Sequence, residues 1–316
     1  MNVDSIKSLV LGLPEVAAWP DMAGIFERTA AQLGRDWELP FLACRAVGGE
    51  SSLAAPGAAA IACIQLAIVL VDDMLDEDPR GDYHRLGHGP TANLALAFQA
   101  AALRLAAQSS VDAERQAAIA ASLADIGLGT ALGQHLDAQN QGNEADYWKV
   151  VRAKSAPFYG NALYIGALLG KADLQVAGRL RDFGVLIGEL AQIYDDLLDA
   201  FQSPAKPDWK RGRNSLPILY ALTADHPARA RFMELLPQVY DPQALREAQQ
   251  ILIACGAVSY CAYQATQRYQ TARRLLESLP LADLGPMTDA LGRQSKPLIG
   301  LFQRACVEVP ADLFTR

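Results

Sequence analysis

Apolar residues recur at spacings of three and four along most of the chain, while alternation with a period of two is rare. This period is typical of α-helices with one buried face. It covers residues 22–33, 91–108, 112–138, 144–170, 173–202 and 242–279. Glycine, proline and asparagine interrupt it at residues 48–49, 87–90, 139–143, 203–207 and 279–280. The sequence therefore predicts an all-α protein of about ten or more packed helices.

The longest apolar stretch runs from Leu53 to Val71 and has no charged residue among its 19 positions. That length comes close to what spans a bilayer. However, the stretch contains Pro56 and Gln65, and it leads directly into an acidic run that begins at Asp72. A core helix that is apolar on all sides explains it better, so we expect no integral membrane segment.

The chain has 316 residues, of which 51% are hydrophobic and 20% charged, and this suits a globular protein with a sizeable core. No interruption is long or biased enough to mark a boundary, so one domain over residues 1–316 is predicted. The net charge of -7 argues against a nucleic-acid partner. Five scattered cysteines without a CxxC pair, and an N-terminus unlike a secretory signal, indicate a reduced, cytoplasmic protein.

Two copies of the acidic pattern DDxxD, at residues 72–76 and 195–199, each end a long apolar stretch. On a helix, the first and last carboxylates of such a pattern lie one turn apart on one face, with the second beside them. Unpaired, they would repel one another, whereas Mg²⁺ prefers a few carboxylates together with waters and phosphate oxygens. One such motif can be solvated surface, but two with similar apolar lead-ins favour a metal-bound diphosphate. The predicted metal ligands are Asp72, Asp73, Asp76, Asp195, Asp196 and Asp199.

Several further motifs accompany the second acidic pattern in a fixed order. They are Gly133-Gln134 with Leu136-Asp137, Lys154-Ser155, Phe183-Gly184 with Gly188, Gln192-Ile193-Tyr194 before Asp195, and the loop Asp208 to Pro217. Together they resemble the trans-isoprenyl diphosphate synthases, or polyprenyl synthetases, and their terpene-synthase relatives, from about Pro40 to about Leu222. The resemblance implies an isoprenoid-synthase-like helical bundle with a central cavity, a homodimer, and Mg²⁺ as cofactor, with three ions when substrate is bound.

Cleavage of an allylic diphosphate requires neutralisation of the negative charge that develops on the leaving group. Metal ions and fixed cations provide it. The predicted catalytic residues are accordingly Asp72, Asp76, Asp195 and Lys154. The predicted diphosphate contacts are Lys154, Lys210, Arg213, Arg80 and Gln192. Taken by itself, Lys210 is equally compatible with a solvated surface charge.

The chain departs from the chain-elongating members of this family where they hold isopentenyl diphosphate. Their basic GGKRxRP segment corresponds here to residues 34–40, which have acids and Trp37 where cations belong. Gln65 stands where a histidine is usual, and Arg80 remains alone of an arginine pair. Each charge-assisted contact of this kind is worth about 1.5–3 kcal/mol. We therefore expect an impaired isopentenyl diphosphate site.

These departures favour an enzyme that ionises one allylic prenyl diphosphate and then cyclises the cation or captures it with water, which is a class I terpene synthase. By resemblance the substrate is about C15 to C25. Three alternatives stay open. In the first, the chain still elongates its substrate, with Arg35 and Arg80 as contacts for isopentenyl diphosphate. In the second, it transfers the prenyl group to a peptide, an aromatic ring or a phosphorylated acid. The third, an inactive regulatory subunit, is disfavoured because both acidic motifs are intact.

Overall fold

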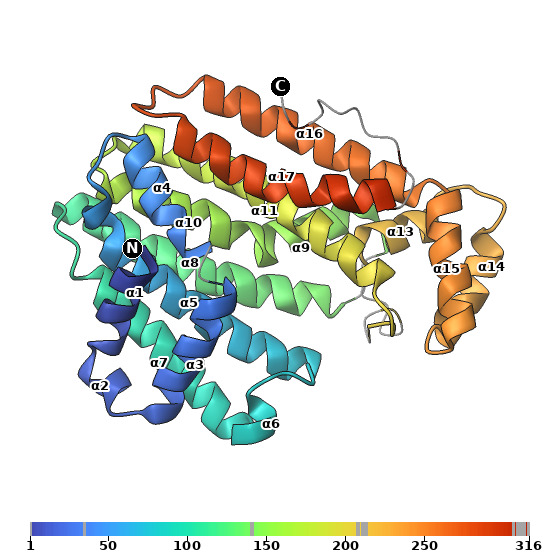
Figure 1. Ribbon diagram of the computed structural model, residues 1–316, viewed down its shortest axis with the longest axis horizontal. Helices are drawn as coiled ribbons and strands as arrows, with labels where there is room; N and C mark the ends of the chain where they lie inside the picture. The colour runs from blue at the N-terminus through green and yellow to red at the C-terminus, as the bar shows by residue number, and fades with distance from the viewer. Residues whose placement is uncertain are drawn as a thin grey trace. The chain divides into compact units, whose positions relative to one another are not determined.

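The computed structural model describes residues 2–33, 36–139, 142–206, 209, 214–304, 307 and 314. All regular elements in this part of the chain are helices, and no strand occurs there (Figure 1). The all-α prediction is confirmed.

Each predicted helical range corresponds to one or two of the observed helices. The α-helices are α1 (Asn2–Leu11), α2 (Pro14–Ala17), α3 (Pro20–Leu33), α4 (Leu39–Ala46), α5 (Ala55–Asp76), α6 (Tyr83–Leu86), α7 (His88–Ala106), α8 (Ala113–Asp137), α9 (Glu144–Lys154), α10 (Ala156–Leu169), α11 (Leu174–Phe201), α13 (Leu216–Thr223), α14 (Arg229–Leu235), α15 (Pro242–Ala254), α16 (Ala257–Glu277) and α17 (Gly285–Arg304). Three short 3₁₀ helices are η1 (Asp36–Glu38), η2 (Ser51–Ala54) and η3 (Leu236–Gln238). Helices α1, α2, α4, α6, α13, α14 and α17 lie outside the predicted ranges.

Two of the predicted helical ranges each contain two helices. The range 144–170 breaks at Ser155, which ends α9, and Pro157 then occupies the first turn of α10. Proline is tolerated there because the amides of a first turn have no partner within the helix. The range 242–279 breaks at Gly256, whose φ of 87° lies in the left-handed region that favours glycine.

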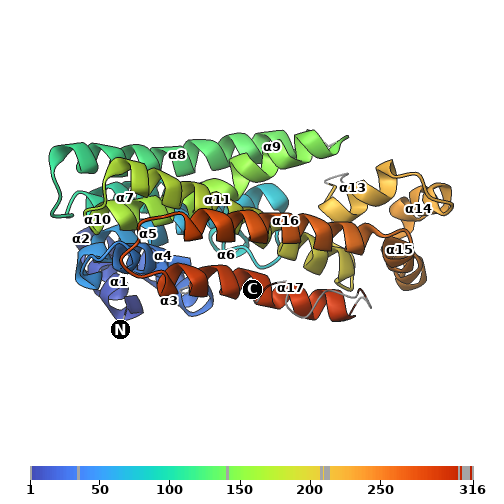
Figure 2. The same cartoon turned by 90° about the horizontal axis from the view of Figure 1, so that it is seen from above.

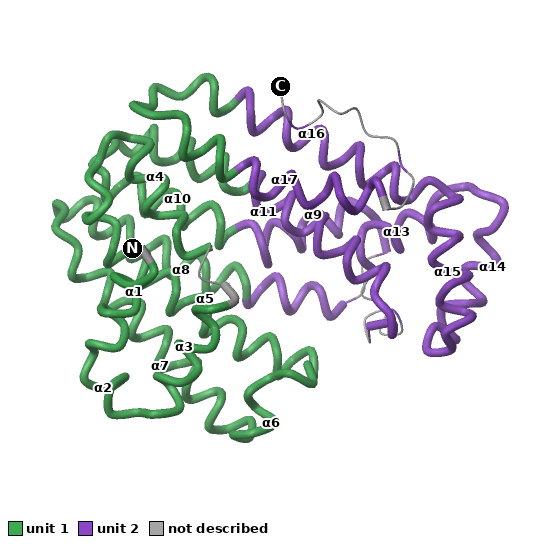
Figure 3. Tube along the Cα trace, viewed as in Figure 1, with its two compact units in different colours: residues 1–130, 157–185, 275–290 green, residues 131–156, 186–274, 291–316 purple. Residues whose placement is uncertain are grey.

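The chain divides into two compact units, and each consists of three separate segments (Figure 3). Unit 1 comprises residues 1–130, 157–185 and 275–290, and unit 2 comprises residues 131–156, 186–274 and 291–316. The prediction of one domain over the whole chain stays a prediction.

The apolar helix α5 is the central element of unit 1. It contacts α1, α4 and α7, and its side chains Ile61, Ile64 and Leu66 are almost completely buried. By length and composition alone the helix over residues 51–76 could cross a membrane, but 67% of its most apolar window is buried inside the structure. This burial agrees with the prediction of a core helix, and it fixes the end of α5, where the first acidic motif lies.

In unit 2, α13, α14 and α15 enclose an apolar core of their own. Trp209, Phe232 and Leu252 are buried there, with the Trp209 and Phe232 ring centroids 6.2 Å apart. Helices α14 and α15 lie side by side in both views (Figures 1 and 2). The small residue Ala200, in the last turn of α11, belongs to the same core. The end of α11 is thereby anchored, and with it the second acidic motif.

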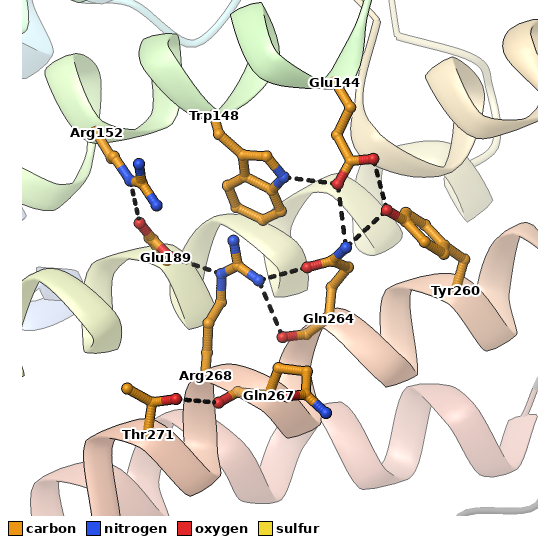
Figure 4. A network of polar contacts seen from close by, with 9 residues as sticks. All are labelled: Glu144, Trp148, Arg152, Glu189, Tyr260, Gln264, Gln267, Arg268 and Thr271. Atoms are coloured by element: carbon orange, nitrogen blue, oxygen red, sulfur yellow. Dashed lines mark hydrogen bonds and ion pairs between the residues drawn. The ribbon is translucent and has the colours of Figure 1, made fainter. Parts of the chain in front are cut away.

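A buried ion pair joins α9, α11 and α16 in unit 2 (Figure 4). Glu189, which is 2% exposed, lies 2.7 Å from Arg152 Nε and 2.6 Å from Arg268 Nε. The Arg268 guanidinium also stacks over Trp148, 3.5 Å from the ring centroid, which is a favourable cation–π geometry. Burial lowers the pKa of Arg268, while the Glu189 carboxylate opposes that shift. The two arginines therefore stabilise a carboxylate that would be costly to bury alone.

The same network extends to the first turn of α9. Glu144 accepts hydrogen bonds from Trp148 Nε1 at 2.9 Å, Tyr260 Oη at 2.6 Å and Gln264 Nε2 at 3.0 Å (Figure 4). A carboxylate in a first helical turn is also favoured by the helix dipole. These contacts hold α9 against α16 and leave little freedom for α9 to slide.

Candidate active site

The first acidic motif forms the last turn of α5 in unit 1. Asp72, Asp73 and Asp76 are each partly buried, and the helix ends at Glu77, whose φ of 54° is left-handed. Burial raises the pKa of Asp73 to about 6, and the neighbouring Asp78 and Asp72 carboxylates add to the rise. The carbonyl end of a helix carries a partial negative charge, so acids crowd here at an energetic cost. A bound cation would remove that cost.

Arg80, a predicted diphosphate contact, lies just beyond this turn. Its Nη2 is 2.7 Å from Asp78 Oδ2, and its Nε and backbone N–H both donate to Asp78 Oδ1. The Arg80 side chain is 83% exposed. The fork-shaped contact keeps the guanidinium beside the acidic turn, where its role toward a diphosphate stays a prediction.

The second acidic motif occupies the penultimate turns of α11 in unit 2, and its three carboxylates differ in environment. Asp195 is exposed, Asp199 is partly buried, and Asp196 is only 5% exposed. Lys206 Nζ lies 2.5 Å from Asp199 Oδ1. Lys206 is not among the residues predicted from the sequence, because nothing in its local sequence indicates which helix its side chain reaches.

Asp196 is held by donors from three elements. Its Oδ2 accepts hydrogen bonds from Tyr147 Oη at 2.7 Å and from Leu216 N at 2.6 Å, and its Oδ1 accepts from Gln192 Nε2 at 2.7 Å. Burial raises the pKa of Asp196 to about 6, against the lowering effect of these donors. Tyr147 was also missed, because an aromatic residue at a helical spacing is usually part of the core.

The motif residues around Lys154 come together although they are distant in sequence. Lys154 Nζ lies 3.3 Å from Asp137 Oδ2, and both side chains are mostly buried. A Cβ atom on Gly133 would clash with the backbone N of Lys154, so α8 and α9 touch through their backbones here. One residue on, Ser155 Oγ donates to Gln192 Oε1 at 2.6 Å. Ser155 and Gln192 are thus linked to Asp196 in unit 2, and Lys154 directly precedes Ser155.

Two residues that depart from the chain-elongating pattern contact each other in unit 1. Trp37 Nε1 donates to Gln65 Oε1 at 2.5 Å, and the indole stacks on Phe26 with ring centroids 5.4 Å apart. Trp37 is completely buried. A neutral, apolar cluster therefore stands where the family pattern has cations. Among the other predicted contacts, Arg35, Lys210 and Arg213 lie outside the described residues.

Mg²⁺ fits the donor chemistry of both acidic motifs. Within the described ranges, no three histidine, cysteine or carboxylate groups converge as a ready ligand set. Mg²⁺ does not need such a set, because it keeps several waters and takes phosphate oxygens from its substrate. Burial is the main cause of the raised pKa of Asp73, the Asp78 and Asp72 carboxylates add to it, and a bound cation would favour the ionised form.

Comparison with known proteins identifies the class of protein that has this all-α fold and two carboxylate motifs at helix ends. The model of the polyprenyl synthetase family matches residues 38–252, and the chain belongs to that family. A short chain isoprenyl diphosphate synthase from Methanothermobacter thermautotrophicus is 31% identical over 262 residues, which are 78% of this chain and 80% of that protein. A geranylfarnesyl diphosphate synthase from Aeropyrum pernix is 26% identical, covering 85% and 88% of the two chains.

Solved structures show the same fold. The crystal structure of a geranylgeranyl pyrophosphate synthetase from Pyrococcus horikoshii has a TM-score of 0.81 at 19% identity, and the match covers 93% of this chain and 95% of that one. A decaprenyl diphosphate synthase from Rhodobacter capsulatus also gives 0.81 at 19% identity, covering 95% and 96%. The relatives by sequence are named as synthases of prenyl diphosphates. They support chain elongation, the alternative above, and lend no support to the predicted cyclisation.

Proposed function

We propose that the protein is a Mg²⁺-dependent prenyltransferase that extends an allylic prenyl diphosphate with isopentenyl diphosphate. Family membership and the names of the relatives support the reaction class. The observation that carries the proposal is the polar group of unit 2, in which Gln192 bonds both to Asp196 of the second acidic motif and to Ser155, the residue that follows Lys154. The first acidic motif, at the end of α5, is a second group of carboxylates, in unit 1.

In this proposal the carboxylates bind the metal, and the lysine binds the diphosphate. Bound Mg²⁺ would neutralise the diphosphate as the bond to the allylic carbon breaks. Asp72, Asp76 and Asp195 hold the metal, and the ammonium of Lys154 contacts a phosphate oxygen. Apolar side chains of the helix bundle keep water from the allylic cation, so the carbon–carbon double bond of isopentenyl diphosphate can attack it. The new cation then loses a proton to the released diphosphate, which restores a double bond.

Ionisation without chain elongation is a second candidate, and one observation favours it. Trp37 donates a hydrogen bond to Gln65 and stacks on Phe26. This buried cluster is neutral, so it provides no positive charge that could bind a second diphosphate. If the cluster stands at the isopentenyl subsite, the allylic cation would instead be captured by its own double bonds or by water.

Product analysis distinguishes the two candidates. The purified protein is incubated with Mg²⁺ and each allylic diphosphate from C10 to C25, with and without isopentenyl diphosphate. Longer diphosphates that appear only with isopentenyl diphosphate would support elongation. Hydrocarbons or alcohols formed without it, and without phosphatase treatment, would support the second candidate. No diphosphate release from any substrate would refute both.

We also propose that the protein is a cytoplasmic homodimer. Leu96 and Leu103 lie seven residues apart on one face of α7 and are 64% and 48% exposed, and Leu128 on α8 is 72% exposed. Large exposed apolar side chains of this kind are characteristic of interfaces. The thiols of Cys44 and Cys63 are buried and unpaired, which suits a reducing compartment.

A further inference from the structure

The three carboxylates of the second acidic motif are equivalent in sequence but not in structure. Asp195 is open to solvent and Asp199 is partly so, whereas Asp196 is 5% exposed. A metal ligand must present an oxygen to a hydrated ion. Asp196 instead directs its oxygens toward neighbouring helices of unit 2, so its function should differ from that of the other two.

The hydrogen bonds of Asp196 use most of its accepting capacity. A carboxylate has about four lone-pair positions on its two oxygens. Tyr147 Oη and Leu216 N take two at Oδ2, and Gln192 Nε2 takes one at Oδ1. These donors come from α9, α13 and α11 itself, so one side chain connects three helices.

One of these bonds caps a helix. Leu216 is the first residue of α13, and the preceding Ser215 makes no capping hydrogen bond with its side chain. The Asp196 carboxylate supplies the missing acceptor from α11 at 2.6 Å. Negative charge is favoured at a helix N-terminus, so Asp196 fixes where α13 begins.

The ionised carboxylate also fixes the direction of a hydrogen-bond chain. A carboxylate only accepts, so the Gln192 amide must turn its Nε2 toward Asp196. Its Oε1 then faces Ser155 Oγ, which has to donate its single proton at 2.6 Å. Both hydrogen bonds therefore have a fixed direction, from Ser155 to Gln192 and from Gln192 to Asp196, and the ionised Asp196 determines it.

We infer that Asp196 is a positioning residue and not a metal ligand: it orients the Gln192 amide and the Ser155 hydroxyl beside Lys154, while Asp195 and Asp199 serve the metal. This inference rests on the proposed function, because it assigns different tasks within the same diphosphate site. The network in Figure 4 joins α9 to α16 through Glu144 and to α11 through Glu189. Gln192 lies on α11 and Ser155 directly follows α9, so the same helix packing supports their contact.

The variant Asp196→Asn tests the inference with little change in shape. The oxygen of the substituted side chain can still accept from Tyr147 and Leu216, and its amide can donate to Gln192, which must then turn over. We expect KM for the allylic diphosphate to rise about tenfold, while kcat and the Mg²⁺ concentration for half-maximal rate stay within about twofold of wild type. The matched variant Asp195→Asn should raise the Mg²⁺ requirement instead.

A double-mutant cycle shows whether Asp196 acts through Gln192. In a Gln192→Ala background, Asp196→Asn should have little further effect on KM, because the amide that it orients is gone. Additive effects in the cycle would overturn the inference. So would a rise in the Mg²⁺ requirement of Asp196→Asn that matches that of Asp195→Asn.

Calorimetric titration of Mg²⁺ with inorganic pyrophosphate separates this inference from the proposed function. Wild-type protein that binds neither would refute the proposed function and the inference together. If wild type binds, Asp196→Asn should keep the Mg²⁺ affinity and Asp195→Asn should lose it; equal losses would refute the inference alone. Should Asp196→Asn fail to fold by circular dichroism, Tyr147→Phe removes one donor and leaves the charge, and it should likewise leave the Mg²⁺ affinity unchanged.

Discussion

At the scale of single residues, the two acidic motifs share the pattern DDxxD, but residues at the same position of the pattern have different surroundings. Asp73 and Asp196 hold the same position in DDxxD, and burial raises the pKa of each to about 6. Asp73 is additionally affected by neighbouring carboxylates, whereas Asp196 is held by three hydrogen-bond donors. The metal prediction for Asp72, Asp76 and Asp195 stays a prediction, and the first test below addresses it.

Replacing Asp72 or Asp195 with alanine should abolish turnover without harming the fold. Both acids lie in the last turns of their helices, where negative charge opposes the helix dipole. We therefore expect the melting temperature of either variant, measured without Mg²⁺, to stay unchanged or rise slightly. Turnover of an allylic diphosphate and thermal unfolding are the two measurements. Full activity in either variant would contradict the metal assignment.

Glu189→Ala should destabilise the protein by about 3–5 kcal/mol. The substitution leaves the guanidinium of Arg268, whose side chain is 10% exposed, buried without its counter-charge. Urea unfolding followed by circular dichroism measures the change. Glu247→Ala is the control, because Glu247 pairs with Arg231 on the surface, and its loss should leave the free energy of unfolding almost unchanged. Equal effects of the two substitutions would contradict a structural role for the buried pair.

At the scale of elements, close helix contacts place the residues that the motifs contain. The GQxxD motif and the Lys-Ser pair are recognised separately in the sequence, and the contact between α8 and α9 at Gly133 is what brings Asp137 to Lys154. The predicted ranges match the bounds of α7, α8 and α11 to within three residues. The breaks at Ser155 and Gly256 were not predicted, because the apolar pattern continues across both.

Gly133→Ala should separate α8 from α9 and weaken the site. The added Cβ would clash with Lys154 N, which is backbone that can yield only if a helix shifts. We expect a loss of about 1–3 kcal/mol in stability and a higher KM for the allylic diphosphate. In Gly178→Ala, a control within α11, the new Cβ meets nothing within 4 Å, so the substitution should stabilise by about 0.5–1 kcal/mol. An unaffected KM in Gly133→Ala would contradict the role of this contact.

At the scale of the whole molecule, each compact unit is assembled from three stretches of chain. Helices α8, α11, α16 and α17 each contribute residues to both units. A linear cut through the sequence therefore isolates neither unit, and the two acidic motifs belong to different units. The proposed homodimer adds a further level of assembly.

Substituting glutamate for Leu96 and Leu128 together should convert a dimer into monomers. The two side chains are 64% and 72% exposed in one chain, and a charge is costly to bury in an interface. Sedimentation velocity of the full-length protein measures the mass. Met233→Glu on α14, which is 53% exposed, serves as the control and should keep the wild-type mass. A wild-type protein that is monomeric at micromolar concentration would refute the proposed dimer.

The sequence by itself determined the all-α class, the core helix before Asp72, the ends of the helices with a clear apolar period such as α8 and α11, the two acidic motifs and their companion Lys154. These features follow from periodicity and short spacings, which depend on residues a few positions apart. Only the tertiary structure decided that Asp196 is buried among Tyr147, Gln192 and Leu216, or that Trp37 reaches Gln65. Such contacts join residues that are distant in the chain, and the packing of whole helices, which no local pattern encodes, determines which of them meet.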